Sequence, residues 1–146
     1  MSFGLTSEQQ ALQRRVRALA EGGIRDRAAE VDRSEAYPRE NVDALVGEGL
    51  LGYTIPTRLG GQGGSLLDAV VIVEEMARVC GVTGRIAVEA NMGALSAVMR
   101  YGSEAQGALA ARLVLSGDKP AICITEPDAG SAAGDMTTSA RQRGDR

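Results

Sequence analysis

The pattern of apolar residues changes once along this chain, close to residue 118, and this change limits the folds that the chain can form. From residue 5 to about 117, apolar side chains recur at intervals of three and four residues, as on one face of an α-helix. A β-branched run over 121–125 then stops at Glu126-Pro127. Since proline cannot donate a hydrogen bond to a sheet, a strand must end or turn there. The sequence therefore predicts an α-helical domain over residues 1–117 and the beginning of a β domain over 118–146.

Capping residues and glycines divide the helical part into predicted helices. Thr6 or Ser7, Ser65 and Ser103 are each followed, three positions on, by a side chain that can complete a helix cap. A glycine pair at 22–23 is expected to end the first helix. The expected helices cover about 6–21, 25–35, 38–50, 66–80, 83–100 and 104–116. The glycine-rich stretch 52–64 lacks the Lys-Ser/Thr ending of a nucleotide-binding P-loop, so we interpret it as a chain reversal between helices.

Composition excludes several functional classes. The net charge is −3, the 16 Lys and Arg residues are scattered, and only one Phe and three Tyr are aromatic, so we expect no nucleic-acid partner. No window approaches the roughly 20 apolar residues of a membrane span, so we expect no membrane insertion. Histidine is absent, which excludes His-based catalysis and His-ligated metal sites within this chain. Two cysteines form no disulfide framework, so a reducing cytoplasm is the expected location.

The segment 122–131 carries the strongest functional signal. Thr125, with its hydroxyl group, stands at the end of the predicted strand. The small residues that follow are expected to expose backbone N–H groups and the Ser131 hydroxyl. Such a set suits a ring with polar edges that is joined to a phosphate. On composition alone, a plain strand followed by a glycine turn explains the same residues.

The string Thr125-Glu126-Pro127-Asp128-Ala129-Gly130-Ser131 resembles the flavin-binding signature of the acyl-CoA dehydrogenase family. Further strings that recur in that family stand in the same order along nearly the whole chain. They are Leu5-Thr6-x-Glu8-Gln9, Gly49-Leu50-Leu51-Gly52, Ile55-Pro56-x3-Gly60-Gly61-x-Gly63, Glu74-Glu75-Met76-Ala77 and Tyr101-Gly102-Ser103-Glu104-x-Gln106. The chain is thereby identified as a member of this family.

The resemblance implies FAD as cofactor and an acyl-CoA substrate. It places Ile122, Ile124 and Thr125 against the flavin, Gly130 and Ser131 at the FAD pyrophosphate, and Ser131 also at the substrate. Family members continue through a β-barrel and a C-terminal four-helix bundle, which this chain lacks, and they are commonly homotetramers. The catalytic base is therefore expected beyond Arg146 or is absent, and the 146-residue chain alone is expected to be inactive.

Arg85 is the residue that refines the substrate. On a helical wheel it shares a stripe with Glu89, Met92 and Ser96, opposite the buried face, so a solvated Arg85–Glu89 pair is one interpretation. The other comes from the resemblance, because glutaryl-CoA dehydrogenases place an Arg here that binds the carboxylate at the far end of the acyl chain. A planar guanidinium meets two oxygens of such an anion at once.

A narrower likeness points to the 3-sulfinopropanoyl-CoA desulfinases of the same superfamily. It is carried by Gly84-Arg85-Ile86, the run 117–124, and Ala132, which stands where the family usually has Asp. These enzymes bind FAD, have lost the usual base, and release sulfite to leave propanoyl-CoA. Arg85 would then bind the sulfinate. The alternatives are α,β-dehydrogenation of a glutaryl- or succinyl-CoA type substrate, and a non-catalytic scaffold fragment.

Overall fold

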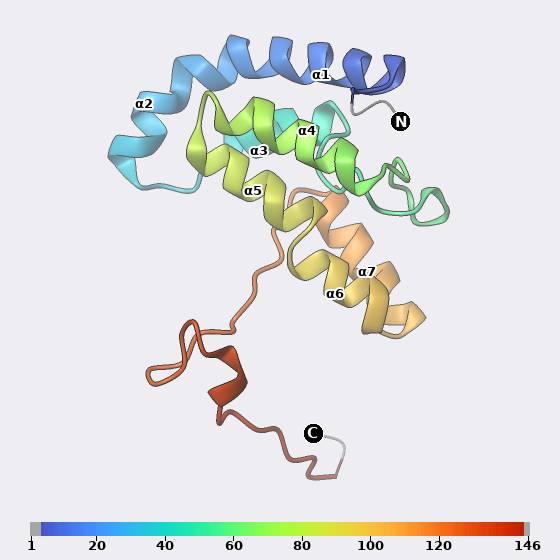
Figure 1. The fold of residues 1–146 in the computed structure, drawn as a ribbon, viewed down its shortest axis with the longest axis vertical. Helices are drawn as coiled ribbons and strands as arrows, with labels where there is room; N and C mark the ends of the chain where they lie inside the picture. The colour runs from blue at the N-terminus through green and yellow to red at the C-terminus, as the bar shows by residue number, and fades with distance from the viewer. Residues whose placement is uncertain (1–3, 145–146) are drawn as a thin grey trace.

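The computed structural model describes residues 4–144, in which all regular structure is helical (Figure 1). The α-helices are α1 (Ser7–Leu19), α2 (Arg25–Ser34), α3 (Arg39–Gly47), α4 (Leu66–Ala77), α5 (Gly81–Asn91), α6 (Ala94–Tyr101) and α7 (Glu104–Leu115). Shorter turns are the π-turn η1 (Ala20–Ile24) and the 3₁₀ turns η2 (Thr57–Leu59) and η3 (Ala133–Asp135). No helix in this part of the chain combines the length and the apolar character that crossing a bilayer requires.

Three helix starts confirm the capping prediction. Thr6, Ser65 and Ser103 each accept a hydrogen bond from the backbone three residues on, and the side chain there bonds back to the cap. The predicted stop at residues 22–23 was wrong in detail. The chain passes through the wide turn η1, where Gly22 takes non-helical backbone angles, and continues directly into α2. Buried Ala20 and Ile24 keep this turn packed on the core, so the glycines bend the helix path rather than ending it.

The predicted single helix over 83–100 is two helices. The break falls at Met92 and Gly93, between α5 and α6. Asn91, the last residue of α5, uses its side chain to bond the loop that follows α3, at Leu50 and Tyr53. Helix α5 therefore ends where the buried Asn91 side chain bonds a segment far away in the sequence. Gly93, a poor helix former, follows and favours the break.

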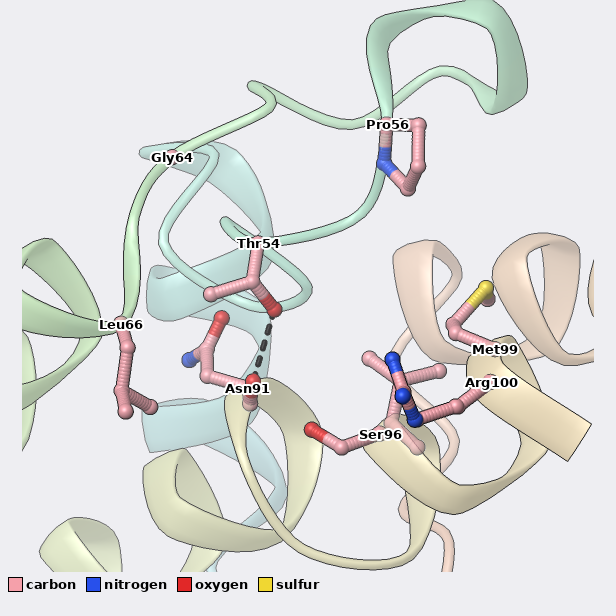
Figure 2. Close-up of a pocket in the computed structure, with 9 residues that line it drawn as sticks. Thr54, Pro56, Gly64, Leu66, Asn91, Ser96, Met99 and Arg100 are labelled. Atoms are coloured by element: carbon pink, nitrogen blue, oxygen red, sulfur yellow. Dashed lines mark hydrogen bonds between the residues drawn. The ribbon is translucent and has the colours of Figure 1, made fainter.

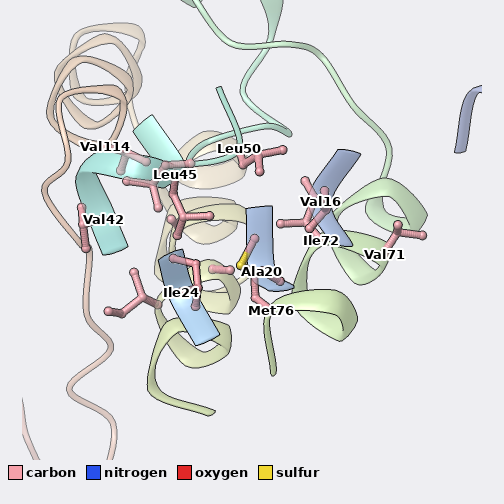
Figure 3. Close-up of a cluster of buried hydrophobic side chains, with 14 of the residues drawn as sticks. Val16, Ala20, Ile24, Val42, Leu45, Leu50, Val71, Ile72, Met76 and Val114 are labelled. Atoms are coloured by element: carbon pink, nitrogen blue, oxygen red, sulfur yellow. The ribbon is translucent and has the colours of Figure 1, made fainter. Parts of the chain in front are cut away.

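One hydrophobic core joins the helices, and Figure 3 shows side chains from α1, η1, α3, α4 and α7 meeting in it. Its large apolar side chains without exposed surface lie between residues 16 and 76. They are Val16, Ile24, Val42, Leu45, Leu50, Ile55, Ile72 and Met76. Helix α4 lies between α1 and α5, with which it makes its main contacts. The helix predicted over 66–80, including its β-branched run 70–73, forms as α4 and ends at Ala77. Its burial was predicted all round, but Leu66, Leu67 and Val70 are exposed, so only one side of α4 lies in the core.

The predicted strand over 121–125 is not formed in the described residues. After Gly117, which has a φ of 100°, the chain leaves the helices as an irregular segment (Figure 1, orange to red). Its one sheet-like contact is an isolated bridge between Glu126 and Ala129. A strand gains its stability from a neighbouring strand, and no other described segment lies beside this one. The helical domain is therefore confirmed, whereas the start of a β-barrel is not observed.

Candidate functional site

Arg85 lies one turn into α5, with its side chain 67% exposed, and forms an ion pair with Glu89. Glu89 itself is buried, with only 5% of its side chain exposed. The predicted stripe of solvated residues is therefore wrong at Glu89. A helical wheel assumes one buried face, but α5 packs against α3, α4 and α6, so a second side of this helix is also covered.

A hollow of about 460 Å³ lies beside Arg85. It is bordered by the α2–α3 connection, the start of α5 and the connector that leads to residues 122–131, the predicted flavin-binding segment. Its lining residues are Glu35, Ala36, Tyr37, Pro38, Gly81, Val82, Arg85, Ile86 and Lys119. Two cations, Arg85 and Lys119, and one carboxylate, Glu35, thus border a mainly apolar space. The excess of positive charge suits a ligand with an apolar body and an anionic end.

A second hollow, of about 510 Å³, opens between the glycine-rich loop and α6 (Figure 2). Thr54 and Asn91 line one side, where the Thr54 hydroxyl donates to the Asn91 carbonyl at 2.7 Å. Ser96 and Arg100 line the other side from successive turns of α6. Sequence reasoning did not identify this hollow, because it forms where the glycine-rich loop meets residues 91–100, far along the chain, and no local motif marks either segment.

The Asn91 side chain ties the glycine-rich loop to α5. Its Oδ1 accepts from the Tyr53 N–H at 2.6 Å, and its Nδ2 donates to the carbonyls of Leu50 (3.1 Å) and Ala87 (3.0 Å). The side chain is almost wholly buried, so these bonds replace water that cannot reach it. The same amide that fixes the wall of the second hollow therefore also ends the helix that carries Arg85.

In the predicted flavin-binding segment, the residues expected to contact FAD are exposed to solvent. Ile122 and Ile124 are 52% and 49% exposed, and Thr125, Gly130 and Ser131 are also exposed. Within the described residues, the N–H groups of Gly130 and Ser131 form no hydrogen bond with the protein. A methyl group built on Gly130 would meet no atom within 4 Å.

The Glu126 carboxylate closes a loop over residues 126–138. It accepts from the N–H groups of Thr137 (2.9 Å) and Thr138 (2.8 Å) and from the Thr137 hydroxyl. The Thr138 side chain, followed by these two N–H groups, lowers the pKa of Glu126 to about 2. Glu126 is therefore ionised at neutral pH and holds residues 126–138 as a loop around Gly130 and Ser131.

These features fit a flavin nucleotide in chemical type. Exposed apolar side chains can cover a flat ring, while free N–H groups and a hydroxyl can bind phosphate oxygens. The structure does not bring this segment to Arg85, because the hollow beside Arg85 takes only Lys119 from the chain after α7. Across residues 4–144, no group of three or more His, Cys, Asp and Glu side chains could hold a metal ion.

Residues 6–118 match the family described as the acyl-CoA dehydrogenase N-terminal domain. Four relatives that are 51–57% identical over 98–99% of this chain are named 3-sulfinopropanoyl-CoA desulfinase. Those of Paraburkholderia xenovorans and Cupriavidus necator are 57% and 56% identical, and the chain spans 37% and 36% of their lengths. The solved structure of butyryl-CoA dehydrogenase from Megasphaera elsdenii superposes with a TM-score of 0.81 at 26% identity, over 91% of this chain and 36% of that one.

Proposed function

Because the chain belongs to the acyl-CoA dehydrogenase family, we propose that it supplies the helical domain and the first flavin-binding segment of an FAD-dependent enzyme that acts on acyl-CoA. The proposed activity is desulfination of 3-sulfinopropanoyl-CoA. The observation that carries it is the 51–57% identity, over nearly all of this chain, to four relatives of that name. The chain covers only slightly more than a third of those relatives, so the activity belongs to a longer protein.

The proposed reaction is balanced without an electron acceptor. Water and 3-sulfinopropanoyl-CoA give propanoyl-CoA and hydrogen sulfite: the carbon–sulfur bond breaks, carbon takes a proton, and sulfur takes the oxygen of water. FAD, when bound, would supply an electron-poor ring system. Ile122, Ile124 and Thr125 would line its ring and Gly130 and Ser131 its pyrophosphate, with Ser131 also at the substrate. Their exposure and the free N–H groups at 130 and 131 support this assignment.

Arg85 is the proposed ligand of the sulfinate. Its guanidinium is permanently charged and planar, so it can offer two parallel N–H groups to two sulfinate oxygens. The mainly apolar lining beside it leaves room for a short acyl chain. Lys119 adds a second positive charge to the same hollow. Glu35 is the one carboxylate that lines this hollow, so the two positive charges remain in excess and favour a substrate with an anionic tail over a neutral one.

Three finer proposals concern the complete protein: its location, its number of subunits and its flavin. We expect a cytoplasmic homotetramer that binds FAD and not FMN. Light scattering on the purified protein gives the number of subunits, and mass spectrometry of the released flavin identifies the cofactor. A colourless, monomeric product would instead favour a scaffold without a flavin site.

The test of the proposed activity uses the protein encoded by the complete reading frame that contains this chain. Incubation with 3-sulfinopropanoyl-CoA should release sulfite and propanoyl-CoA in equal amounts, with no reduction of an electron-accepting dye. Arg85→Ala should lower kcat/KM by about 100-fold. Arg85→Lys should lower it by about tenfold, because lysine keeps the positive charge but cannot offer two parallel N–H donors. Arg25→Ala, an exposed arginine on α2, is the control. Dye reduction with succinyl-CoA and no sulfite would replace desulfination by dehydrogenation.

A further inference from the structure

Arg85 has a single carboxylate partner among the described residues, and that partner is unusually fixed. Its Nη2 pairs with Oε1 of Glu89, four residues further along α5. The arginine side chain is mostly exposed, whereas the glutamate side chain is almost fully enclosed. A long exposed arginine normally samples many rotamers, and an enclosed carboxylate does not.

The Glu89 carboxylate is confined from its other side by Gly93. Its Oε2 has no hydrogen-bond partner within residues 4–144, and a Cβ built on Gly93 would collide with this oxygen. The absence of a side chain at position 93 therefore makes the space that the carboxylate occupies. Since a buried charge is costly without a counter-charge, Arg85 is the group that stabilises Glu89 in this place.

A second pair of the same spacing shows what burial adds. Glu21 and Arg25 also form an ion pair four residues apart, but both side chains are about half exposed, at 43% and 55%. Pairs of that kind are screened by water and hold a side chain weakly. Glu89 differs because it is buried and has no room to follow Arg85 into solvent.

We propose that Glu89 is the positioning residue for Arg85, holding the guanidinium at the hollow before the acyl-CoA arrives. The proposal rests on the proposed function, in which Arg85 binds the anionic tail. Glu89 engages one N–H of Nη2, which leaves the other N–H of Nη2, together with the parallel N–H of a neighbouring guanidinium nitrogen, for the ligand. The side-chain entropy of Arg85 is then lost during folding rather than at each binding event, and preorganisation of this kind raises affinity.

The first test measures order without ligand. In the 146-residue chain, NMR relaxation of the Arg85 Nε–H group should report a restricted side chain in the wild type and a mobile one in Glu89→Ala. Glu89→Gln keeps an acceptor oxygen of the same size and should keep Arg85 restricted. Glu21→Ala should free Arg25 without any effect on Arg85. A mobile Arg85 in the wild type would overturn the proposal.

The second test measures binding to the complete protein with two unreactive thioethers, S-(3-carboxypropyl)-CoA and S-butyl-CoA. Glu89→Ala should weaken the carboxylate-bearing thioether about tenfold and leave the neutral one unchanged, whereas Glu89→Gln should stay within about threefold of the wild type. Gly93→Ala, which displaces the carboxylate but keeps both charges, should act like Glu89→Ala. Equal or tighter binding of the anionic thioether by Glu89→Ala would overturn the proposal. If Arg85→Ala also keeps the wild-type preference for the anion, the proposed function fails as well.

Discussion

Replacing Asn91 with alanine should destabilise the helical domain more than any surface substitution. The change removes three hydrogen bonds of a buried side chain, to Tyr53, Leu50 and Ala87. At a net value of about 1 kcal/mol each, the loss in the free energy of unfolding is about 3 kcal/mol. The Tyr53 N–H and the Leu50 carbonyl are left without these partners, so relaxation of the loop recovers little of this free energy.

Urea unfolding followed by circular dichroism measures this loss. With a slope of about 1–3 kcal/mol per molar urea, the midpoint should fall by about 1–3 M. Amide exchange at Tyr53 should accelerate more than exchange in the middle of α1, since the lost bond is local. Gln10→Ala is the control, because Gln10 is exposed and donates one bond to the Leu5 carbonyl. A change below 1 kcal/mol in Asn91→Ala would refute the idea that this amide holds the loop.

Three further predictions concern stability and charge. The hydrogen bond from Arg17, and then the charge of Arg78, lower the pKa of the buried Glu75 carboxyl. The ion pairs of Glu75 therefore stabilise the fold fully above the ordinary glutamate pKa, and this stabilisation is lost as the pH falls below that value. Acid unfolding of Glu75→Gln should accordingly show a weaker pH dependence in this range. The Thr137 and Thr138 amide signals should titrate with the carboxylate of Glu126 at a pKa of about 2, not near 4.5. Gly52→Ala should lose about 1–2 kcal/mol, because φ is +70° and the new Cβ would lie 2.7 Å from Ile55 Cδ1.

Local signals predicted the local structure of this protein well. The helix caps at Ser65 and Ser103 involve partners three residues away, so they can be read directly from the sequence. The family, its helical N-terminal domain and the desulfinase likeness also agree with the comparisons. The strand over 121–125 could not form from its own residues, because pairing depends on chain outside this segment.

Long-range packing explains the remaining errors. The break after Asn91 depends on partners at residues 50 and 53, about 40 positions earlier, and nothing beside Asn91 announces them. Burial of Glu89 depends on a helix covered on more than one side, which a single-face pattern cannot show. The roles proposed for Arg85 and Ser131 stay predictions, since they depend on a ligand.

The packing of α1 on α4 has a consequence for synthesis of the protein. Arg17 of α1 pairs with Glu75 of α4, 58 residues later, and Gln9 donates to Asp68, 59 residues later. On a ribosome that adds about 5–20 residues per second, the first helix therefore emerges roughly 3–12 s before the helix that covers it. During that interval its apolar stripe is open to chaperones. The time for which the apolar side of α1 stays uncovered in the cell is thus set by the translation rate between codons 19 and 77.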